Sequence, residues 1–518
     1  MPALNWIGKE QVVNHDKEVP FRLLKKVKSI SVGENSQNLI IHGDNLEALK
    51  ALMPYYCNKI KCIYIDPPYN TGNEGWVYND NVNSTKIKRW LGKVVGGETE
   101  DLCRHDKWLC MMYPRLKLLK DLLKENGAIF VSIDDDEADH ARALLDEIFG
   151  RQNFVATIIW QKKFSPQSDA KFFSDVHDYI LVYSKNITNF RVKLLQRKES
   201  TNARYLNLDN DPRGLWMSSD FSVKTYSKKY DYPITTPSGK IVKATKGRCW
   251  ATSKERFKEF VKDNRIWFGK NLNGVPRLKR FLSEVKEGIV PTTIWFYQEV
   301  GHNQEARQEL KKIFRGKELL FDNPKPVRLI KRIIQLATDS DDLILDSFVG
   351  SGTTGQAVLE LNKEDSGNRK FILVELEDAV AKNITAERIK RVIKSEKLDV
   401  GFEFCELDRP LFNSEGEIEN ECVFEQLATY IYFTETQTNI DKKQINKSYI
   451  GLSPDEINEY YLIFKEKHKN KLTKEFLKNL KKSTKRKIVY ADFCLISQDE
   501  LDKYNIEFKQ IPYEIKRY

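Results

Sequence analysis

Strand-like apolar runs alternate with longer helical patterns in two separate stretches of this 518-residue chain. Parallel strands need crossover connections, which helices usually supply. The alternation therefore predicts an α/β fold with a mostly parallel sheet covered on both faces. It fades after about residue 185 and resumes near residue 342. The strand-like runs fall within residues 38–44, 62–66, 127–134, 154–160, 179–184, 342–354 and 370–377.

The interruption predicts that an inserted domain splits this α/β core. The intervening segment is polar, basic and aromatic, with turn signals instead of strands and crossover helices. Beyond about Gly401 the chain mixes short strand-like runs with a lysine-rich stretch, residues 453–482, that we expect to be helical. The expected regions are a first core half at 1–186, the inserted domain at 187–315, a second core half at 316–400 and an α+β C-terminal region at 401–518.

Positive charge is concentrated in two runs of a chain whose formal net charge is +11. Residues 240–286 hold 14 Lys or Arg against 4 Asp or Glu, with Trp and Phe interleaved. Residues 465–487 hold 11 basic residues against 2 acidic ones. Basic clusters mixed with aromatic residues are typical of phosphate contacts combined with base stacking. A solvated basic face is the alternative for the second run.

Composition excludes several other classes of protein. No stretch approaches the roughly 18 uninterrupted apolar residues of a membrane span, and the N-terminus lacks an apolar signal core. We therefore expect a cytoplasmic protein that does not bind membranes. The 8 cysteines include no C-x-x-C pair, which favours reduced thiols and argues against a metal site.

The run Cys62–Ile65 is followed by an acid, two prolines and a tyrosine, "DPPY". Proline cannot donate a backbone hydrogen bond, so the strand should stop at Asp66. Asp66 and Tyr69 would then lie at the carboxyl end of a strand, where open α/β sheets bind ligands. An ordinary strand-ending turn is the alternative.

A second motif, "ILDSFVGSGTTGQAV", combines a strand, a glycine turn and the start of a helix. Its glycines allow a tight turn that brings a ligand close to free backbone N–H groups. Residues 350–355 also spell G-x-G-x-x-G, and Glu375 follows about 20 residues later, as in dinucleotide-binding sites. A nicotinamide-dependent oxidoreductase therefore remains an alternative.

The sequence "DEAD" at residues 136–139 is a weaker signal. A helicase would also need a G-x-x-x-x-G-K-[ST] phosphate loop, and no Gly-Lys pair in the chain has that context. We instead expect these acids to cap a helix that starts near Ala138.

The two motifs together suit methylation of an amine on a nucleobase. Such an amine is a poor nucleophile, because its lone pair is delocalised into the ring. A carboxylate and a rigidly held carbonyl that accept its two hydrogens would favour a pyramidal nitrogen, and an aromatic ring could stack on an extruded base. The glycine turn could hold a methyl donor opposite that nitrogen.

"DPPY" and "FVGSG" resemble the signature of S-adenosylmethionine-dependent amino-methyltransferases that act on DNA. "DPPY" precedes "FVGSG" with a long insert between them, as in the β group of adenine-N6 methyltransferases. The resemblance covers nearly the whole chain, and "VYADFCL" and "FKQIPYEI" resemble the tails of modification (Mod) subunits of type III restriction systems.

The resemblance implies roles for matching residues. The catalytic set, which would hold the target amine and stack on the flipped adenine, is Asp66, Pro67, Pro68 and Tyr69. The cofactor set is Asp44, Asn323, Lys325, Pro326, Asp346, Phe348, Gly350, Gly352, Thr353 and Glu375. Asp44 would lie near the cofactor's adenine, and Asn323, Lys325 and Pro326 near its methionine end. Phe164 is expected to pack in the core, with closure of the base site as the alternative.

We therefore expect a Rossmann-like methyltransferase fold with circularly permuted motif order. Its reaction would move a methyl group from S-adenosylmethionine to the N6 amine of adenine in double-stranded DNA. The inserted domain would recognise the target, and the expected partners are a second copy of the chain and a helicase-nuclease restriction subunit. The lysine-rich tail would contact DNA or one of these partners. The alternatives are an N4-cytosine methyltransferase, the oxidoreductase and a DNA-binding scaffold without activity.

Overall fold

The computed structural model separates into two compact units. The large unit comprises Met1–Val192 and Thr292–Tyr518, and the inserted unit is Lys193–Pro291. The described residues are 4–33, 36–70, 104–168, 170–197, 202–285, 288–315, 321, 323–413, 415–441, 445–466, 468–480 and 483–515. None of the helices within these ranges combines the length and the apolar character that crossing a membrane requires.

Within the described residues, the large unit contains a ten-stranded sheet in the order β1-β17-β2-β16-β15-β3-β4-β6-β5-β14. Strands β17, β2, β16, β15, β3 and β4 run parallel, whereas β1 and β6 are antiparallel to their neighbours. The predicted mostly parallel α/β sheet is therefore confirmed. The strands are β1 Arg22–Lys26, β2 Leu39–His42, β3 Ile60–Ile65, β4 Leu123–Ile133, β5 Phe154–Gln161, β6 His177–Ser184, β14 Ile294–Trp295, β15 Leu343–Asp346, β16 Lys370–Glu375 and β17 Glu403–Pro410.

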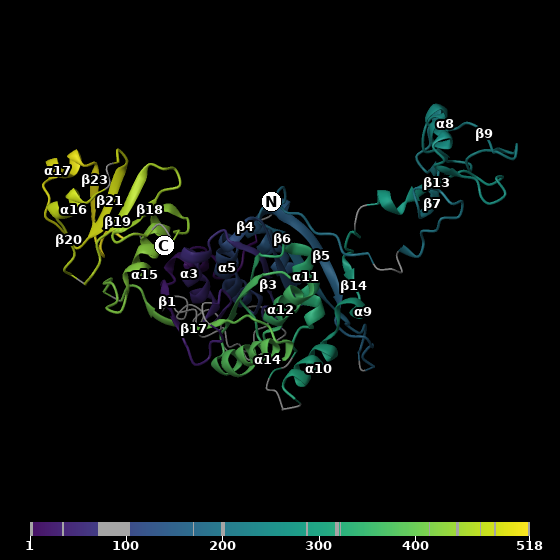
Figure 1. Ribbon diagram of the computed structural model, residues 1–518. Coiled ribbons are helices and arrows are strands. Elements are labelled where there is room, and N and C mark those ends of the chain that lie inside the picture. Colours follow the sequence, from purple (N-terminus) through teal and green to yellow (C-terminus); the bar gives the residue numbers. More distant parts are fainter. Residues whose placement is uncertain are drawn as a thin grey trace. The chain divides into compact units, whose positions relative to one another are not determined.

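Strands β3 and β15 are direct neighbours, although a long segment separates them in the sequence. Figure 1 labels β3 in the large unit, with β4 and β6, the next two strands on its other side. Strands β3 and β15 pair in parallel, with Ile344 opposite Cys62 and Leu345 opposite Ile63. The carboxyl ends of parallel neighbours lie at one edge of a sheet, so Asp66 and the glycine turn after Asp346 share that edge. The two core halves are confirmed as parts of one sheet.

Helices cover both faces of this sheet. Ile63 and Ile65 of β3 share a hydrophobic core with α3, α5 and α6, and α11 packs on β3 and β4 and against α12. Every residue of β3 is consequently buried. These helices are α3 Asn45–Tyr56, α5 Arg104–Leu122, α6 Ala138–Leu145, α11 Val327–Ala337 and α12 Thr353–Asp365.

The C-terminal region forms a smaller sheet beside α15, in the order β18-β19-β21-β23. The prediction of a long helix at 453–482 is wrong, since the described residues of this stretch form β19, β20 and the short helix α16. The stretch begins with the aromatic run of β19, which has no lysine and pairs with β18 and β21 as a strand. The elements are α15 Phe424–Thr436, β18 Tyr449–Leu452, β19 Asn458–Leu462, β20 Lys471–Leu472, α16 Lys474–Lys478, β21 Arg486–Ala491 and β23 Ile506–Gln510.

The inserted unit is narrower than the expected segment 187–315. Strand β14 pairs in parallel with β5, which ties it and the following helices to the large unit. These helices are α9 Tyr297–Val300 and α10 Asn303–Ile313. The inserted unit itself contains a three-stranded sheet, β12-β13-β7, together with α8. Its main elements are β7 Trp216–Asp220, α8 Lys254–Lys262, β12 Ile266–Trp267 and β13 Arg277–Phe281.

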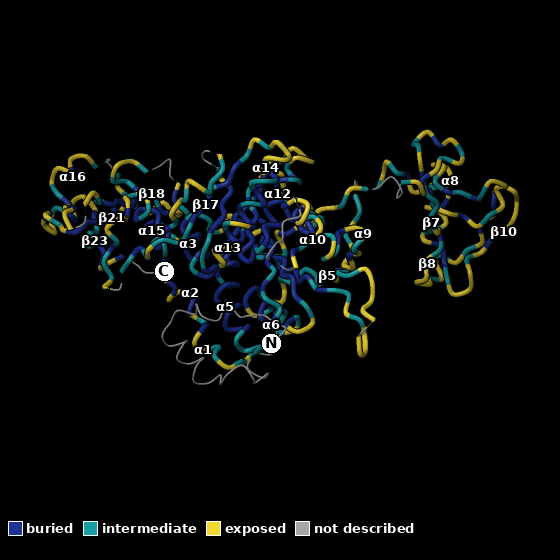
Figure 2. Tube along the Cα trace, turned by 90° about the horizontal axis from the view of Figure 1, so that it is seen from below, coloured by how far each residue is buried: buried dark blue, intermediate teal, exposed yellow. Residues whose placement is uncertain are grey.

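The aromatic residues of the basic run build the core of the inserted unit. Trp250, Phe257 and Phe268 are buried in one hydrophobic cluster with Phe221 and Ile266. The interpretation that they are exposed for base stacking is therefore wrong for these residues. They are buried because so small a unit needs large side chains to fill its core. The exposed residues of this unit lie mainly along α8 and the loops around β10 (Ile241–Val242), as Figure 2 shows.

One lysine of the basic run is also buried. Lys279, which is 1% exposed, lies in β13, and its ammonium is paired with the carboxylates of Asp209 and Asp211. The ammonium also lies 5.2 Å from the ring centroid of Trp216. Lys279 therefore stabilises the inserted unit and is not part of its surface charge.

We predict that Lys279→Met destabilises the inserted unit by about 3 kcal/mol, because it removes the buried cation that Asp209 and Asp211 share and leaves Arg213 to pair with Asp211. Hydrogen exchange should accelerate in β7 and β13 and remain unchanged in β3 and β4 of the large unit. Lys258→Met, an exposed change on α8, is the matched control and should have no such effect. Unchanged exchange in β7 of the Lys279 variant would contradict this role.

Candidate active site

Asp66 directly follows β3, and its carboxylate accepts hydrogen bonds from two other side chains of the site. Its Oδ2 accepts a hydrogen bond from the Lys325 ammonium at 2.5 Å, and its Oδ1 accepts one from the Tyr69 hydroxyl at 2.9 Å. The Lys325 nitrogen also lies 5.0 Å from the centroid of the Tyr69 ring. The structure therefore brings Asp66, Tyr69 and Lys325 into one cluster.

Asp178 and Lys162 extend this cluster, and the sequence analysis missed both. The Tyr69 hydroxyl lies 3.4 Å from Asp178 Oδ2, while Lys162 donates to Asp178 Oδ1 at 2.5 Å. Burial raises the pKa of Asp178, whereas the charges of Lys325 and Lys162 oppose this rise. Because β6 is antiparallel to β4, its first residues lie beside the carboxyl end of β4. An acid at the start of an apolar strand is the only sequence signal for Asp178.

Buried polar contacts hold the loop after Asp66. The Pro68 carbonyl accepts a hydrogen bond from the buried indole nitrogen of Trp108 at 2.8 Å. Asn70 adopts a positive φ of 61° and donates to Glu137, which also lies 2.8 Å from Nδ1 of His105. Helix α6 begins at Ala138 as expected, with Glu137 at the N-cap position and Asp139 in the first turn, but the Glu137 side chain makes no capping bond to the helix. The fold uses its carboxylate to fix the loop.

The glycine turn follows β15 and begins α12. Gly350 and Gly352 have φ angles of 51° and 83°, which other residues rarely adopt. A Cβ at Gly350 would lie 2.6 Å from Cζ of Phe321. The backbone N–H of Gly350 donates to Oε2 of Glu375 at 2.9 Å, and burial raises the pKa of that carboxyl.

Arg388, in α14 (Glu387–Glu396), supports this turn from within the core. Its Nη1 donates to the hydroxyls of Ser351 and Thr353, at 2.9 Å in each case. Thr353 Oγ1 in turn donates to the Lys325 carbonyl at 3.2 Å. Arg388 is fully buried, and this burial lowers its pKa to about 10. The sequence analysis did not identify it, since its spacing resembles that of any helical arginine.

Asp346 lies beneath the turn at the end of β15. Its Oδ1 accepts from the Phe348 N–H at 3.1 Å, and its Oδ2 accepts from the Thr354 hydroxyl. Burial raises its pKa to about 7, and the negative charges of Asp66 and Glu375 contribute. The glycine turn is therefore surrounded by carboxylates that influence one another.

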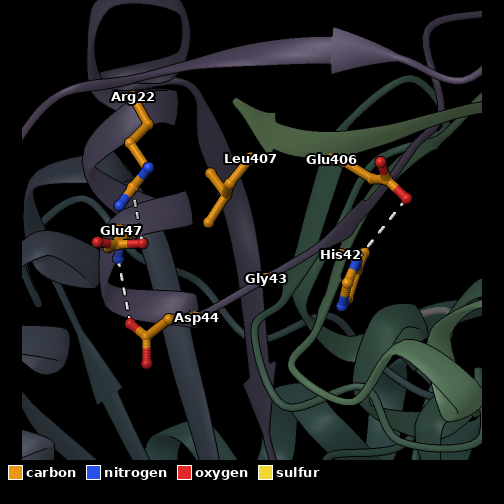
Figure 3. A pocket seen from close by; sticks show the side chains of 7 residues that line it. All are labelled: Arg22, His42, Gly43, Asp44, Glu47, Glu406 and Leu407. Carbon is orange, nitrogen blue, oxygen red and sulfur yellow. Dashed lines mark hydrogen bonds and ion pairs between the residues drawn. The ribbon is translucent and has the colours of Figure 1, made fainter. Parts of the chain in front are cut away.

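Asp44 lies at the carboxyl end of β2, where it has clear structural contacts. Its Oδ1 caps α3 by accepting from the Leu46 N–H at 2.8 Å, and its Oδ2 pairs with Arg115 at 3.1 Å. Asp44 also lines a cavity of about 320 Å³ (Figure 3). The cavity is lined by Arg22, His42, Gly43, Asp44, Glu47, Glu406 and Leu407.

The sequence analysis also predicted places for Asn323, Pro326, Phe348 and Phe164. The side-chain oxygen of Asn323 accepts from Arg307 at 3.0 Å, and Pro326 is the N-cap of α11. Phe348 is buried at the turn. Phe164 is 53% exposed and lies beside Tyr297 and His302, so its expected packing in the core is wrong. It lies between β5 and β6, outside either strand.

Known proteins match this chain over most of its length. The family described as DNA methylase matches residues 60–387. The chain is 36% identical over 376 residues to the type III restriction-modification enzyme StyLTI Mod subunit of Salmonella typhimurium, covering 70% of this chain and 55% of that protein. It is 34% identical over 460 residues to the EcoPI Mod subunit of Escherichia phage P1, covering 76% and 68%. The chain thus spans little more than half the length of the Salmonella relative.

Other matches are shorter or more distant. The type II methyltransferase M.KpnI of Klebsiella pneumoniae is 32% identical over 385 residues, covering 69% of this chain and 85% of that protein. The solved structure of the cytosine-N4-specific PvuII DNA methyltransferase is 14% identical, with a TM-score of 0.34, and covers 69% of this chain and 92% of that chain.

We predict that Asp346→Asn flattens the dependence of stability on pH. Above about pH 4 the unfolded chain loses this proton, whereas the folded chain keeps it until about pH 7. The contribution of Asp346 to stability should therefore fall by about 2 kcal/mol between pH 5 and pH 7. Urea unfolding at both pH values measures this loss, which should be absent in the variant. Equal losses in both proteins would contradict the raised pKa.

Proposed function

The chain belongs to the DNA methylase family, and from this premise we propose that it methylates the N6 amine of adenine in double-stranded DNA with S-adenosylmethionine. One observation carries the proposal. Strand β15 pairs in parallel with β3, so the glycine turn and the Asp66 loop lie at the same sheet edge. A methyl donor at the first could then reach an amine held at the second.

The chemistry of the turn fits the proposed cofactor. S-adenosylmethionine supplies a methyl group on a positively charged sulfonium, and it also carries an ammonium and a carboxylate. The carboxylates of Asp66, Asp346 and Glu375 favour such a cation electrostatically. A nicotinamide dinucleotide would instead bring a negatively charged pyrophosphate to these acids, so the oxidoreductase alternative has no support here. The residues that would hold the cofactor are Phe348, Gly350, Gly352, Thr353 and Glu375.

Asp66 is the residue that would activate the target amine. Its carboxylate and the Pro67 carbonyl would accept the two amine hydrogens and direct the nitrogen lone pair outward. Bound S-adenosylmethionine would supply the methyl carbon, its carbon–sulfur bond breaking as the bond to nitrogen forms. The amine nitrogen would become positive in that transfer and would then release a proton to solvent. The negative charge of Asp66 stabilises that developing charge, so its contact strengthens toward the transition state. The Tyr69 ring would stack on the extruded base.

Adenine N6 is the favoured target because the Salmonella and phage P1 relatives are named type III Mod subunits, the class that the sequence motifs resemble. An N4-cytosine amine would need the same acceptors, so it remains the second candidate. Nucleoside analysis of the methylated product separates the two.

The proposal also assigns roles to the inserted unit and to further subunits. The exposed lysines around β10 would contact DNA phosphates, and the inserted unit would recognise the target sequence. Because its relatives are named as Mod subunits of restriction-modification enzymes, the chain would act together with a restriction subunit. It would do so in the cytoplasm, where its DNA substrate would lie. Formation of a homodimer is part of the same proposal.

We predict that Asp66→Ala lowers single-turnover methyl transfer by at least about 10²–10³-fold, as expected on losing a preorganised electrostatic partner. Asp66→Asn should also fail, since an amide is a weaker acceptor. Tyr69→Ala should cost less, by roughly the 1–3 kcal/mol of one base–aromatic stack. The assay is incorporation of labelled methyl into duplex DNA, with DNA binding measured in parallel. Near-normal transfer by Asp66→Ala would refute the proposed function.

We predict that DNA affinity depends strongly on salt through the inserted unit. Each neutralised phosphate contributes a slope of about −0.9 in log K against log salt. Converting the exposed Lys240, Lys243 and Lys246 to Glu should reduce that slope and leave cofactor affinity unchanged. Three Lys→Glu changes at exposed positions of the large unit serve as the control. An unchanged slope would place the DNA-binding surface elsewhere.

A further inference from the structure

Lys325 occupies the position that the proposed reaction requires for the target amine. Its ammonium donates to Asp66 Oδ2 at 2.5 Å, while Asp66 Oδ1 already accepts from the Tyr69 hydroxyl. It also lies over the Tyr69 ring, 5.0 Å from the centroid, where a stacked base would lie. The Lys325 side chain therefore occupies both the Asp66 oxygen that would accept from the target amine and the Tyr69 ring face on which the base would stack.

We propose that Lys325 is a positioning residue that keeps the base site closed until the cofactor binds. In the free protein its ammonium neutralises Asp66, whose neighbour Asp178 is likewise paired with Lys162. The target base can dock only after the ammonium leaves. This inference rests on the proposed function, because it concerns the same site.

The connection between Lys325 and the glycine turn supplies the link to the cofactor. The Lys325 carbonyl accepts from the Thr353 hydroxyl at 3.2 Å, and Pro326 then begins α11 as its N-cap. The backbone of Lys325 is thus fixed beside the turn, while its flexible side chain reaches across to Asp66. A carboxylate on the bound cofactor would offer the ammonium a second anionic partner at short range.

Charge gives a second reason for the ammonium to leave. The amine nitrogen becomes positive as it is methylated, and a neighbouring ammonium would oppose this change. A methyltransferase that retained Lys325 on Asp66 would lose the electrostatic benefit of that carboxylate. Movement of Lys325 from Asp66 to the cofactor removes the repulsion and frees the acceptor in the same step.

The test measures whether opening of the target base requires the cofactor. A duplex with the recognition sequence, identified by single-base mapping of methylated DNA, carries 2-aminopurine beside the target adenine. S-adenosylhomocysteine is added to or omitted from wild type, Lys325→Met and Lys325→Arg. Lys331→Met is the matched control, because Lys331 lies in α11, shortly after Lys325 in the chain, but pairs with Glu360 and Glu364.

We expect cofactor to increase the fluorescence of wild type and Lys331→Met about tenfold more than that of Lys325→Met, which should unstack the base without cofactor. Lys325→Arg should restore the cofactor requirement, since it restores a cation on Asp66. Equal cofactor dependence in wild type and Lys325→Met would overturn the inference. Methyl transfer by wild type is measured on the same duplex. Its absence would refute the proposed function, whereas normal transfer with equal cofactor dependence refutes only the role of Lys325.

Discussion

The pairing of β15 with β3 is the constraint on which the site depends. Backbone hydrogen bonds between these parallel strands place the ends of two distant segments at one sheet edge. Because helices bury both faces of β3, its direction and register are strongly determined. The Asp66 loop and the glycine turn therefore have a fixed relation that neither short motif could establish alone.

Burial of charge is the second organising feature. The sheet edge collects Asp66, Asp178, Asp346 and Glu375, and burial raises the pKa of the last three. Lys325 and Lys162 pair with the first two, and Arg388 supports the turn from below. Because these four carboxylates outnumber the three cations, the cluster can take up one further positive charge when all of its groups are ionised. In the proposed reaction this is what a cationic cofactor and a developing positive nitrogen both require.

In the inserted unit, aromatic and basic residues that are interleaved in the sequence lie in different places. Its aromatic residues form a core, whereas most of its lysines lie at the surface. The composition of a basic, aromatic segment therefore predicts a cationic surface more reliably than it predicts stacking. The exception is Lys279, whose pairing with Asp209 and Asp211 makes it part of the interior.

Periodicity and local chemistry determined much of the fold. Seven strands of the core sheet were predicted near their observed positions, because alternating patterns and prolines act over a few residues, whereas β1, β14 and β17 were not predicted. The loop at Asp66 and the turn at Gly350 were predicted for the same reason. By contrast, the contacts of Lys325, Asp178 and Arg388 join residues far apart in the chain, and no local pattern encodes them. Only the tertiary structure decided that Lys325 contacts Asp66 and that β19 is a strand, since both depend on neighbours supplied by folding.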